Sequence, residues 1–150
     1  MIKIIAVGKI KEEYLKEAIK EYTKRLSKYT KINIIEVDDE DFDINKTLLK
    51  EKENIIKYIN EKDYIITLEI EGNQIDSIEF SKKIESTLNY NSDITFIIGG
   101  SYGLHDDIKR MSNYKLSFSK MTFPHQLFRV MLLEQIYRSY KIINNESYHK

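Results

Sequence analysis

Three short segments of the chain carry features that could do chemistry. One is the glycine-rich run Gly99-Gly100-Ser101-Tyr102-Gly103, the second is Phe118 to Phe123 before the only proline, Pro124, and the third is the tail Tyr148-His149-Lys150. The chain has no cysteine, and its three histidines lack the spacing of metal ligands. Thiol chemistry and Zn-thiolate sites are therefore excluded, and we expect no metal.

The glycine-rich run directly follows the apolar stretch Ile94 to Ile98. Glycine permits positive φ and lets a ligand approach the backbone closely. A dinucleotide fingerprint needs G-x-G-x-x-G after the first strand, with an acidic residue about 20 positions further on. The run here follows a late strand and fits that motif poorly, so it is either a ligand-binding turn or a plain tight turn.

Pro124 ends a strand-like stretch that leads into an apolar helical pattern. Proline suits the first turn of a helix, whose leading N–H groups have no intrahelical partner. We therefore predict a helix that begins at about Pro124. Its free amides would face the Phe118 to Phe123 segment and could read the polar edge of a ligand.

His125 and Arg129 are four residues apart, so they share one face of this helix. They could form a pair that contacts an anion or a base, or they could be an ordinary N-terminal histidine and a surface arginine. Ser101 or Ser119 with His125 would suggest a hydrolase, but the chain has no G-x-S-x-G elbow and no acid in triad order. The tail is aromatic, titratable and basic, although chain ends of this kind are more often frayed and inert.

The remaining sequence alternates apolar runs with helical periodicity. Such alternation predicts an α/β fold with a mostly parallel sheet, in one domain of residues 1–150, with ligands at the carboxyl ends of the strands. The expected strands are residues 1–7, 32–37, 64–70 and 94–98; the apolar stripes of the expected helices are Leu15, Ala18, Ile19, Tyr22 and Leu26, then Leu48, Leu49, Ile55, Ile56 and Ile59, then Ile78, Ile84 and Leu88.

The charge is balanced overall but not along the chain. The 24 basic and 24 acidic residues give a formal net charge of zero, which argues against nonspecific coating of nucleic acid. Residues 104–150 hold 8 basic and 4 acidic side chains and all three histidines, so an anionic partner would favour that end. The apolar start, residues 1–7, is too short for a signal peptide or a membrane span, and we expect a cytoplasmic protein.

The last helix is apolar around most of its circumference, from Leu127 to Tyr140. We expect it to be buried by its own sheet and by a second subunit.

Taken together, Ile98-Gly99-Gly100-Ser101-Tyr102-Gly103-Leu104, the segment Ser117 to Gln126 with Arg129, and the ending Tyr148-His149-Lys150 resemble the RlmH family of SPOUT methyltransferases. The similarity spans the chain, from Ala6-Val7-Gly8-Lys9 through Thr67-Leu68-Glu69-Ile70 to the tail. It implies a SPOUT-type α/β fold with a C-terminal trefoil knot and a homodimer. It also implies transfer of a methyl group from S-adenosylmethionine to N3 of a pseudouridine in 23S ribosomal RNA, on the assembled ribosome.

The resemblance also assigns candidate site residues. The matching cofactor positions are Leu68, Gly99, Gly100, Phe118, Ser119, Lys120, Met121, Thr122 and Phe123, and the positions on the RNA side are His125, Arg129, Arg138, Tyr148 and His149. Of the latter, Arg129, Tyr148 and His149 are the candidates for substrate positioning or proton transfer, and which one takes the proton is open. Many relatives carry Glu or Asn where this chain has Tyr102, so no polar role is carried over there.

Two other functions are compatible with the residues. The chain could be a nonenzymatic ribosome-binding module with the same knot, or another nucleotide-dependent α/β enzyme. Replacing Gly99 by Val is expected to abolish cofactor binding, because a side chain would crowd the ligand's approach to the backbone.

Overall fold

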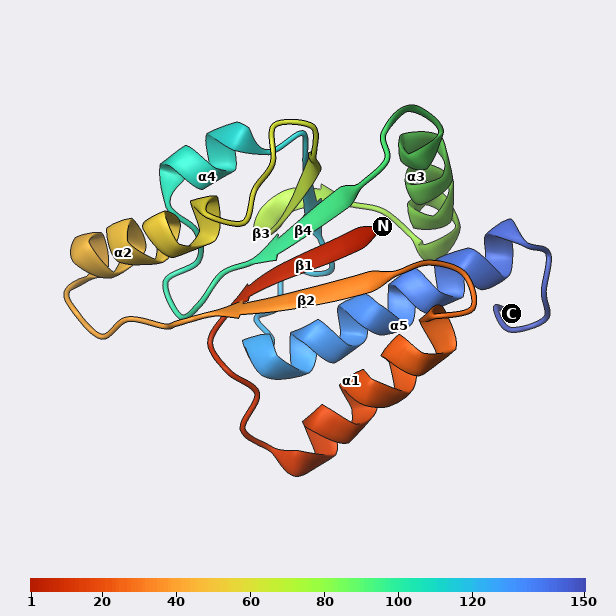
Figure 1. The fold of residues 1–150 in the computed structure, drawn as a ribbon, viewed down its shortest axis with the longest axis horizontal. Helices are drawn as coiled ribbons and strands as arrows, with labels where there is room; N and C mark the ends of the chain where they lie inside the picture. The colour runs from red at the N-terminus through yellow and green to blue at the C-terminus, as the bar shows by residue number, and fades with distance from the viewer.

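The computed structural model describes residues 1–150, and its elements alternate along the chain as expected. Five strands form a single sheet in the order β2-β1-β4-β3-β5, and every neighbouring pair is parallel (Figure 1). The α/β fold with a parallel sheet is therefore confirmed. The elements are β1 (Ile2–Val7), α1 (Glu13–Leu26), β2 (Ile32–Val37), α2 (Ile44–Ile56), β3 (Tyr64–Gln74), α3 (Ser77–Tyr90), β4 (Ile94–Ile98), α4 (Asp106–Met111), β5 (Tyr114–Ser117) and α5 (His125–Ile143).

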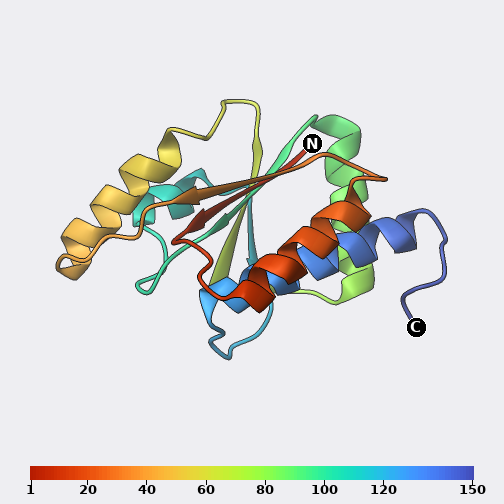
Figure 2. The ribbon, with the colours of Figure 1, turned by 60° about the horizontal axis from the view of Figure 1, so that its bottom comes forward.

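The helices form a layer on each face of the sheet. Helices α2 and α4 lie on one side, and α1, α3 and α5 lie on the other (Figure 2). All six residues of β1 are buried, as expected for a central strand covered on both faces. The larger core cluster joins Ile4, Phe96 and Ile66 to Leu132 and Ile136 of α5, and the smaller cluster lies under α2 and α4.

Strand β3 is longer than expected and contains a bulge. Its residues Leu68 and Asn73 both pair with Leu116 of β5, so Glu69 to Gly72 are looped out of the ladder. A Cβ at Gly72 would lie 2.9 Å from the backbone carbonyl of Lys115, so only glycine allows this close approach.

The segment before Pro124 differs from the prediction. The strand there is β5, which ends at Ser117, and Phe118 to Phe123 form a loop rather than a strand. Pro124 is the N-cap of α5, and the first helical residue is His125, so the predicted helix start is confirmed to within one residue. Asp76 caps α3 in the usual way, accepting a hydrogen bond from the N–H of Glu79 at 2.8 Å, whereas Pro124 supplies no side-chain cap.

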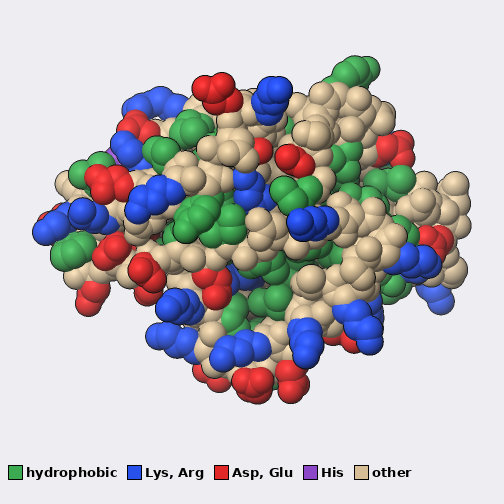
Figure 3. All heavy atoms as spheres, in the orientation of Figure 1, with side chains coloured by type: hydrophobic (Ala, Val, Ile, Leu, Met, Phe, Trp, Pro, Cys, Tyr) green, Lys and Arg blue, Asp and Glu red, His purple; other side chains and the backbone are tan.

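Charged side chains of both signs are interspersed over the surface seen in Figure 3, including the edge formed by α1. This pattern agrees with the zero formal charge. None of the helices has the length and apolar character needed to cross a bilayer.

Candidate functional site

The candidate cofactor residues lie where the strands end. Because all strands are parallel, their carboxyl ends point to one edge of the sheet. Gly99 directly follows β4 and Phe118 directly follows β5, whereas Leu68, expected at a strand end, is the last residue of β3 to pair with β5 before the bulge. Leu68 and Phe118 both pack against the larger core cluster while remaining partly exposed. The parallel topology thus gathers three separate segments at the edge where α/β proteins bind ligands.

The glycine-rich run after β4 is a closed turn. The N–H of Gly103 donates to the carbonyl oxygen of Gly100 at 3.1 Å, and Gly103 has φ of +75°. A Cβ at Gly99 would lie 2.4 Å from the carbonyl oxygen of Gly103, closer than any side chain tolerates. The turn itself therefore requires Gly99, in addition to the predicted collision between a side chain and a ligand.

The loop between β5 and α5 presents unpaired backbone donors. Among the amides of residues 119–123, only that of Met121 is engaged, by the hydroxyl of Ser119 at 3.0 Å. The amides of residues 125–127, in the first turn of α5, also have no partner within the protein. The free donors predicted from Pro124 are thus found on both sides of it.

Aromatic side chains close the inner side of this loop. The ring centroids of Phe118 and Phe128 are 4.6 Å apart, and those of Phe123 and Phe128 are 6.2 Å apart. This apolar surface beside free amides suits a flat ligand with a polar edge. The faces of the ligand's ring can pack on the aromatic side chains while the amides contact its edge.

Arg129, which the resemblance assigns to the RNA side, is fully buried within the chain. Its Nη1 donates to Oε2 of Glu36 at 2.7 Å and its Nη2 donates to the carbonyl oxygen of Gly8 at 3.1 Å. Burial lowers the pKa of Arg129, and the hydrogen bond and charge of Glu36 oppose this shift. The guanidinium therefore ties α5 to the ends of β1 and β2, beneath the surface.

His125 lies near Gly8, at the bend that follows β1, which we call the Gly8 turn. A Cβ at Gly8 would be 3.8 Å from Nε2 of His125, so His125 and Arg129 approach Gly8 from one face of α5, as their spacing predicts.

The tail is folded onto the other end of α5. The Tyr148 hydroxyl donates to Oε2 of Glu134 at 2.7 Å, and the Tyr148 ring meets that of Tyr137 edge-on at 5.0 Å. Nη1 of Arg138 lies 3.1 Å from Nδ1 of His149. The tail is therefore held by the helix, contrary to the frayed end that composition alone favours.

Glu134 connects these groups, and sequence reasoning did not select it. Its Oε1 accepts from Nε of Arg138 at 3.0 Å, and its Oε2 accepts from Nη2 of Arg138 at 3.2 Å. The hydrogen bond and charge of Glu134 raise the pKa of Arg138, while burial and the same carboxylate raise the pKa of Tyr148 to about 12. The sequence did contain one indication of this role, because Glu134 and Arg138 are four residues apart on a helix. Such a spacing, however, usually marks only a surface ion pair.

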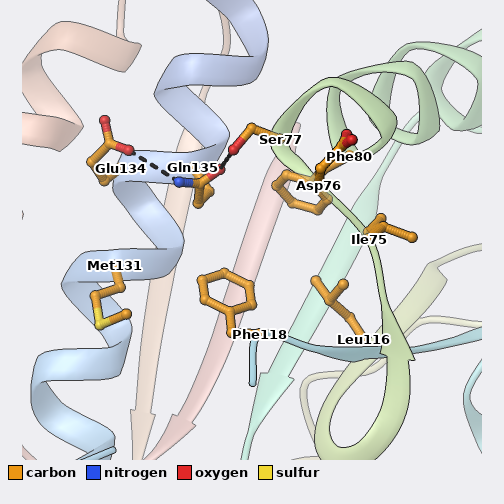
Figure 4. A pocket seen from close by; sticks show the side chains of 9 residues that line it. All are labelled: Ile75, Asp76, Ser77, Phe80, Leu116, Phe118, Met131, Glu134 and Gln135. Atoms are coloured by element: carbon orange, nitrogen blue, oxygen red, sulfur yellow. Dashed lines mark hydrogen bonds between the residues drawn. The ribbon is translucent and has the colours of Figure 1, made fainter. Parts of the chain in front are cut away.

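A cleft of about 380 Å³ lies between the start of α3, the end of β5 and α5 (Figure 4). Phe118 of the candidate cofactor loop and Glu134, which anchors the tail, both line it, and Gln135 accepts a hydrogen bond from Ser77 across its rim at 2.7 Å. The lining residues are Ile75, Asp76, Ser77, Phe80, Leu116, Phe118, Met131, Glu134 and Gln135.

The five predicted residues of the RNA side fall into two groups. His125 and Arg129 lie near the start of α5, whereas Arg138, Tyr148 and His149 lie near its end. The 13 residues from His125 to Arg138 correspond to about 20 Å along a helix axis. One copy of the chain therefore does not bring the two groups to the same small substrate.

Comparisons with known proteins cover nearly the whole chain. Residues 1–149 match the family model described as "Predicted SPOUT methyltransferase". The chain is 57% identical to "Ribosomal RNA large subunit methyltransferase H" of Clostridium botulinum and 56% identical to "Putative ribosomal RNA large subunit methyltransferase H" of Methanococcus maripaludis, in each case over 99% of both chains. A solved structure, "The structure of a probable methylase family protein from Haemophilus influenzae Rd KW20", shares the fold with a TM-score of 0.59 at 14% identity, over 99% of this chain and 70% of that one.

Proposed function

The chain belongs to the RlmH family of SPOUT methyltransferases, and from this premise we propose that it methylates N3 of a pseudouridine in 23S ribosomal RNA, using S-adenosylmethionine, on the assembled ribosome. The observation that carries the proposal is the shared cleft, in which a residue of the candidate cofactor loop and the anchor of the tail face one space. A methyl donor and an acceptor base must meet in such a place.

The proposed cofactor residues are the turn Gly99-Gly100, Leu68 and the loop Phe118 to Phe123. The free amides of the loop fit the edge of an adenine, and Phe118 with Leu68 offers apolar surface for its ring. S-adenosylmethionine supplies a methyl group that is already activated for attack by a nucleophile. The protein's own task is then to hold the acceptor base in line and to stabilise charge on it.

Arg138, Tyr148 and His149 are proposed to position the base, with His125 on the RNA side at the other end of the helix. Tyr148 donates to Glu134 and, with a pKa of about 12, keeps its proton near neutral pH. It therefore acts as a donor and not as a base. Arg129 is proposed to act indirectly, by fixing the Gly8 turn that His125 approaches.

The working form is proposed to be a homodimer in the cytoplasm, each chain a single domain of residues 1–150 with a trefoil knot formed by its C-terminal part. One stripe of α5, which includes Leu127 and Met131, stays partly exposed between the neighbouring helices. Two copies packed antiparallel along this stripe would bring the start of one α5 to the end of the other. Such packing would unite the two groups that lie about 20 Å apart within one chain.

The test is methylation of ribosomes by the purified protein. Ribosomes that lack the modification are incubated with protein and S-adenosylmethionine, and the 23S RNA is digested and analysed by mass spectrometry. We expect one added methyl group, on N3 of a pseudouridine. Methylation of another atom would refute the specificity, and ribosome binding without cofactor binding in calorimetry would indicate a nonenzymatic ribosome-binding module.

A further inference from the structure

The contacts of Arg138 determine how His149 can act. Its Nε and Nη2 are engaged by the carboxylate of Glu134, at 3.0 and 3.2 Å, which leaves Nη1 to face Nδ1 of His149 at 3.1 Å. Both side chains of the Glu134–Arg138 pair are largely buried, at 19% and 25% exposure. The fork geometry of this pair fixes the direction in which Nη1 points.

A guanidinium has only hydrogen-bond donors. Nδ1 of His149 must therefore be the acceptor in this contact, and the proton of the neutral ring must be on Nε2. The other neutral tautomer would direct the N–H of Nδ1 at the N–H of Arg138, so it does not fit this contact.

We infer that Glu134 is a positioning residue which, through Arg138, holds His149 as the neutral Nε2–H tautomer, so that the ring offers the RNA base a hydrogen-bond donor and not a proton acceptor. This inference rests on the proposed function for its substrate, but the tautomer itself does not.

A donor at Nε2 suits the chemistry of the acceptor base. N3 of a pseudouridine lies between two carbonyl groups, and when its N–H bond breaks the negative charge spreads onto their oxygens. The proton goes to solvent water. A donor aimed at one carbonyl oxygen would stabilise this anion, as donors in an oxyanion hole do.

The tautomer can be measured directly by ¹⁵N NMR of the imidazole rings. The chain has only three histidines, so the signals of His149 are assigned by comparison with His105→Gln and His125→Gln variants. We expect a neutral Nε2–H ring for wild-type His149 and a mixture of tautomers after Glu134→Gln. Glu53→Gln is the control, because Glu53 and Lys50 form an exposed intrahelical pair on α2, on the other face of the sheet from the tail. It should leave the spectrum of His149 unchanged.

Kinetics on ribosomes supply the second measurement. His149→Ala should lower kcat by roughly 100- to 1000-fold, as loss of one such donor does. His149→Gln keeps an N–H at a similar reach and should retain most of kcat. Glu134→Gln should lower kcat by up to about 100-fold with little change in the KM for S-adenosylmethionine, because a donor is misplaced.

Two results would overturn the inference. One is a wild-type His149 that carries its proton on Nδ1 or is an imidazolium at neutral pH, and the other is a His149→Gln variant as inactive as His149→Ala. If the wild-type protein methylates no RNA, the proposed function fails, while the NMR spectra still decide the tautomer.

Discussion

At the scale of single residues, Arg129 shows that residue spacing can predict a shared helix face but not burial. Its four-residue separation from His125 predicted a shared helix face, and both side chains do reach the Gly8 turn. Its burial could not be predicted, because the partner that makes it tolerable, Glu36, lies 93 residues earlier in the chain. An arginine without an identified partner is normally assigned to the surface.

Removing this guanidinium should destabilise the fold. Arg129→Ala leaves the Glu36 carboxylate and the Gly8 carbonyl oxygen without their donor, and we expect a loss of about 3 kcal/mol in the free energy of unfolding, the lower end for a broken buried pair because Glu36 is partly exposed. Urea denaturation measures it. Arg110→Ala, at a side chain that is 73% exposed, is the control and should change stability by less than about 0.5 kcal/mol. An Arg129→Ala protein as stable as wild type but slow in turnover would instead indicate direct contact with RNA.

Two glycines of the turn after β4 are required for different reasons, which the sequence alone does not distinguish. Gly99→Ala places a Cβ 2.4 Å from the Gly103 carbonyl oxygen, so the turn must shift, whereas Gly103→Ala meets open space and costs only its positive φ, about 1 to 2 kcal/mol. We therefore expect Gly99→Ala to be the more destabilising of the two in urea denaturation and to weaken binding of S-adenosylmethionine in calorimetry. Equal losses for the two variants would show that the turn absorbs the collision.

At the scale of elements, the long periodic segments were predictable and the short ones were not. The strands at residues 32–37 and 94–98 are found with the predicted bounds, because continuous β-branched runs mark buried parallel strands. Helix α4, with six residues, and strand β5, with four, are too short to show a period. The bulge in β3 depends on pairing with β5, so no local sequence pattern predicts it.

The same limit applies to the candidate site. The loop amides followed from one proline, whose geometry is local. The anchoring of the tail by Glu134 required knowledge of how the chain end folds back over α5, which no local pattern contains.

Helix α5 offers a test of the homodimer. Leu127 is 41% exposed, and a charge placed there would be buried if this stripe forms the interface. We expect Leu127→Asp to shift the protein from dimer toward monomer in light scattering at micromolar concentration and to lower methylation of ribosomes. Ile78→Asp on α3, at a side chain that is 45% exposed, is the matched control and should leave the mass unchanged. A Leu127→Asp protein that remains dimeric would place the interface elsewhere.

At the scale of the whole molecule, one buried acid should shape how stability depends on pH. Glu51 is 4% exposed; burial raises the pKa of its carboxyl, the N–H of Glu40 opposes the shift, and the charges of Asp39 and Glu40 add to it. The folded state thus keeps this proton to higher pH than the unfolded state does. The protonated Glu51 carboxyl therefore contributes its full stability at pH values below 4.5, the usual pKa of this group. That contribution is lost as the pH rises through the pKa of the folded state.

Glu51→Gln should remove this loss of stability at higher pH, because an amide does not ionise. Its neutral amide can still accept from the Glu40 N–H, so the variant should be more stable than wild type near pH 7, with the difference shrinking toward pH 4. Urea denaturation over this range measures it. Glu53→Gln, on the exposed face of the same helix, should follow the wild-type curve. Curves of Glu51→Gln and wild type that stay parallel from pH 4 to 7 would contradict the assignment.

The strand order also has a consequence for synthesis of the protein. Strand β1 pairs with β2 on one side but with β4 on the other, where Ile2 meets Ile94. A nascent chain that grows by about 5 to 20 residues per second must therefore keep one edge of β1, a strand fully buried in the folded sheet, unpaired for roughly 5 to 20 s. During this time β1 exposes an unpaired edge, and the first strand translated is among the last to be completed in the sheet.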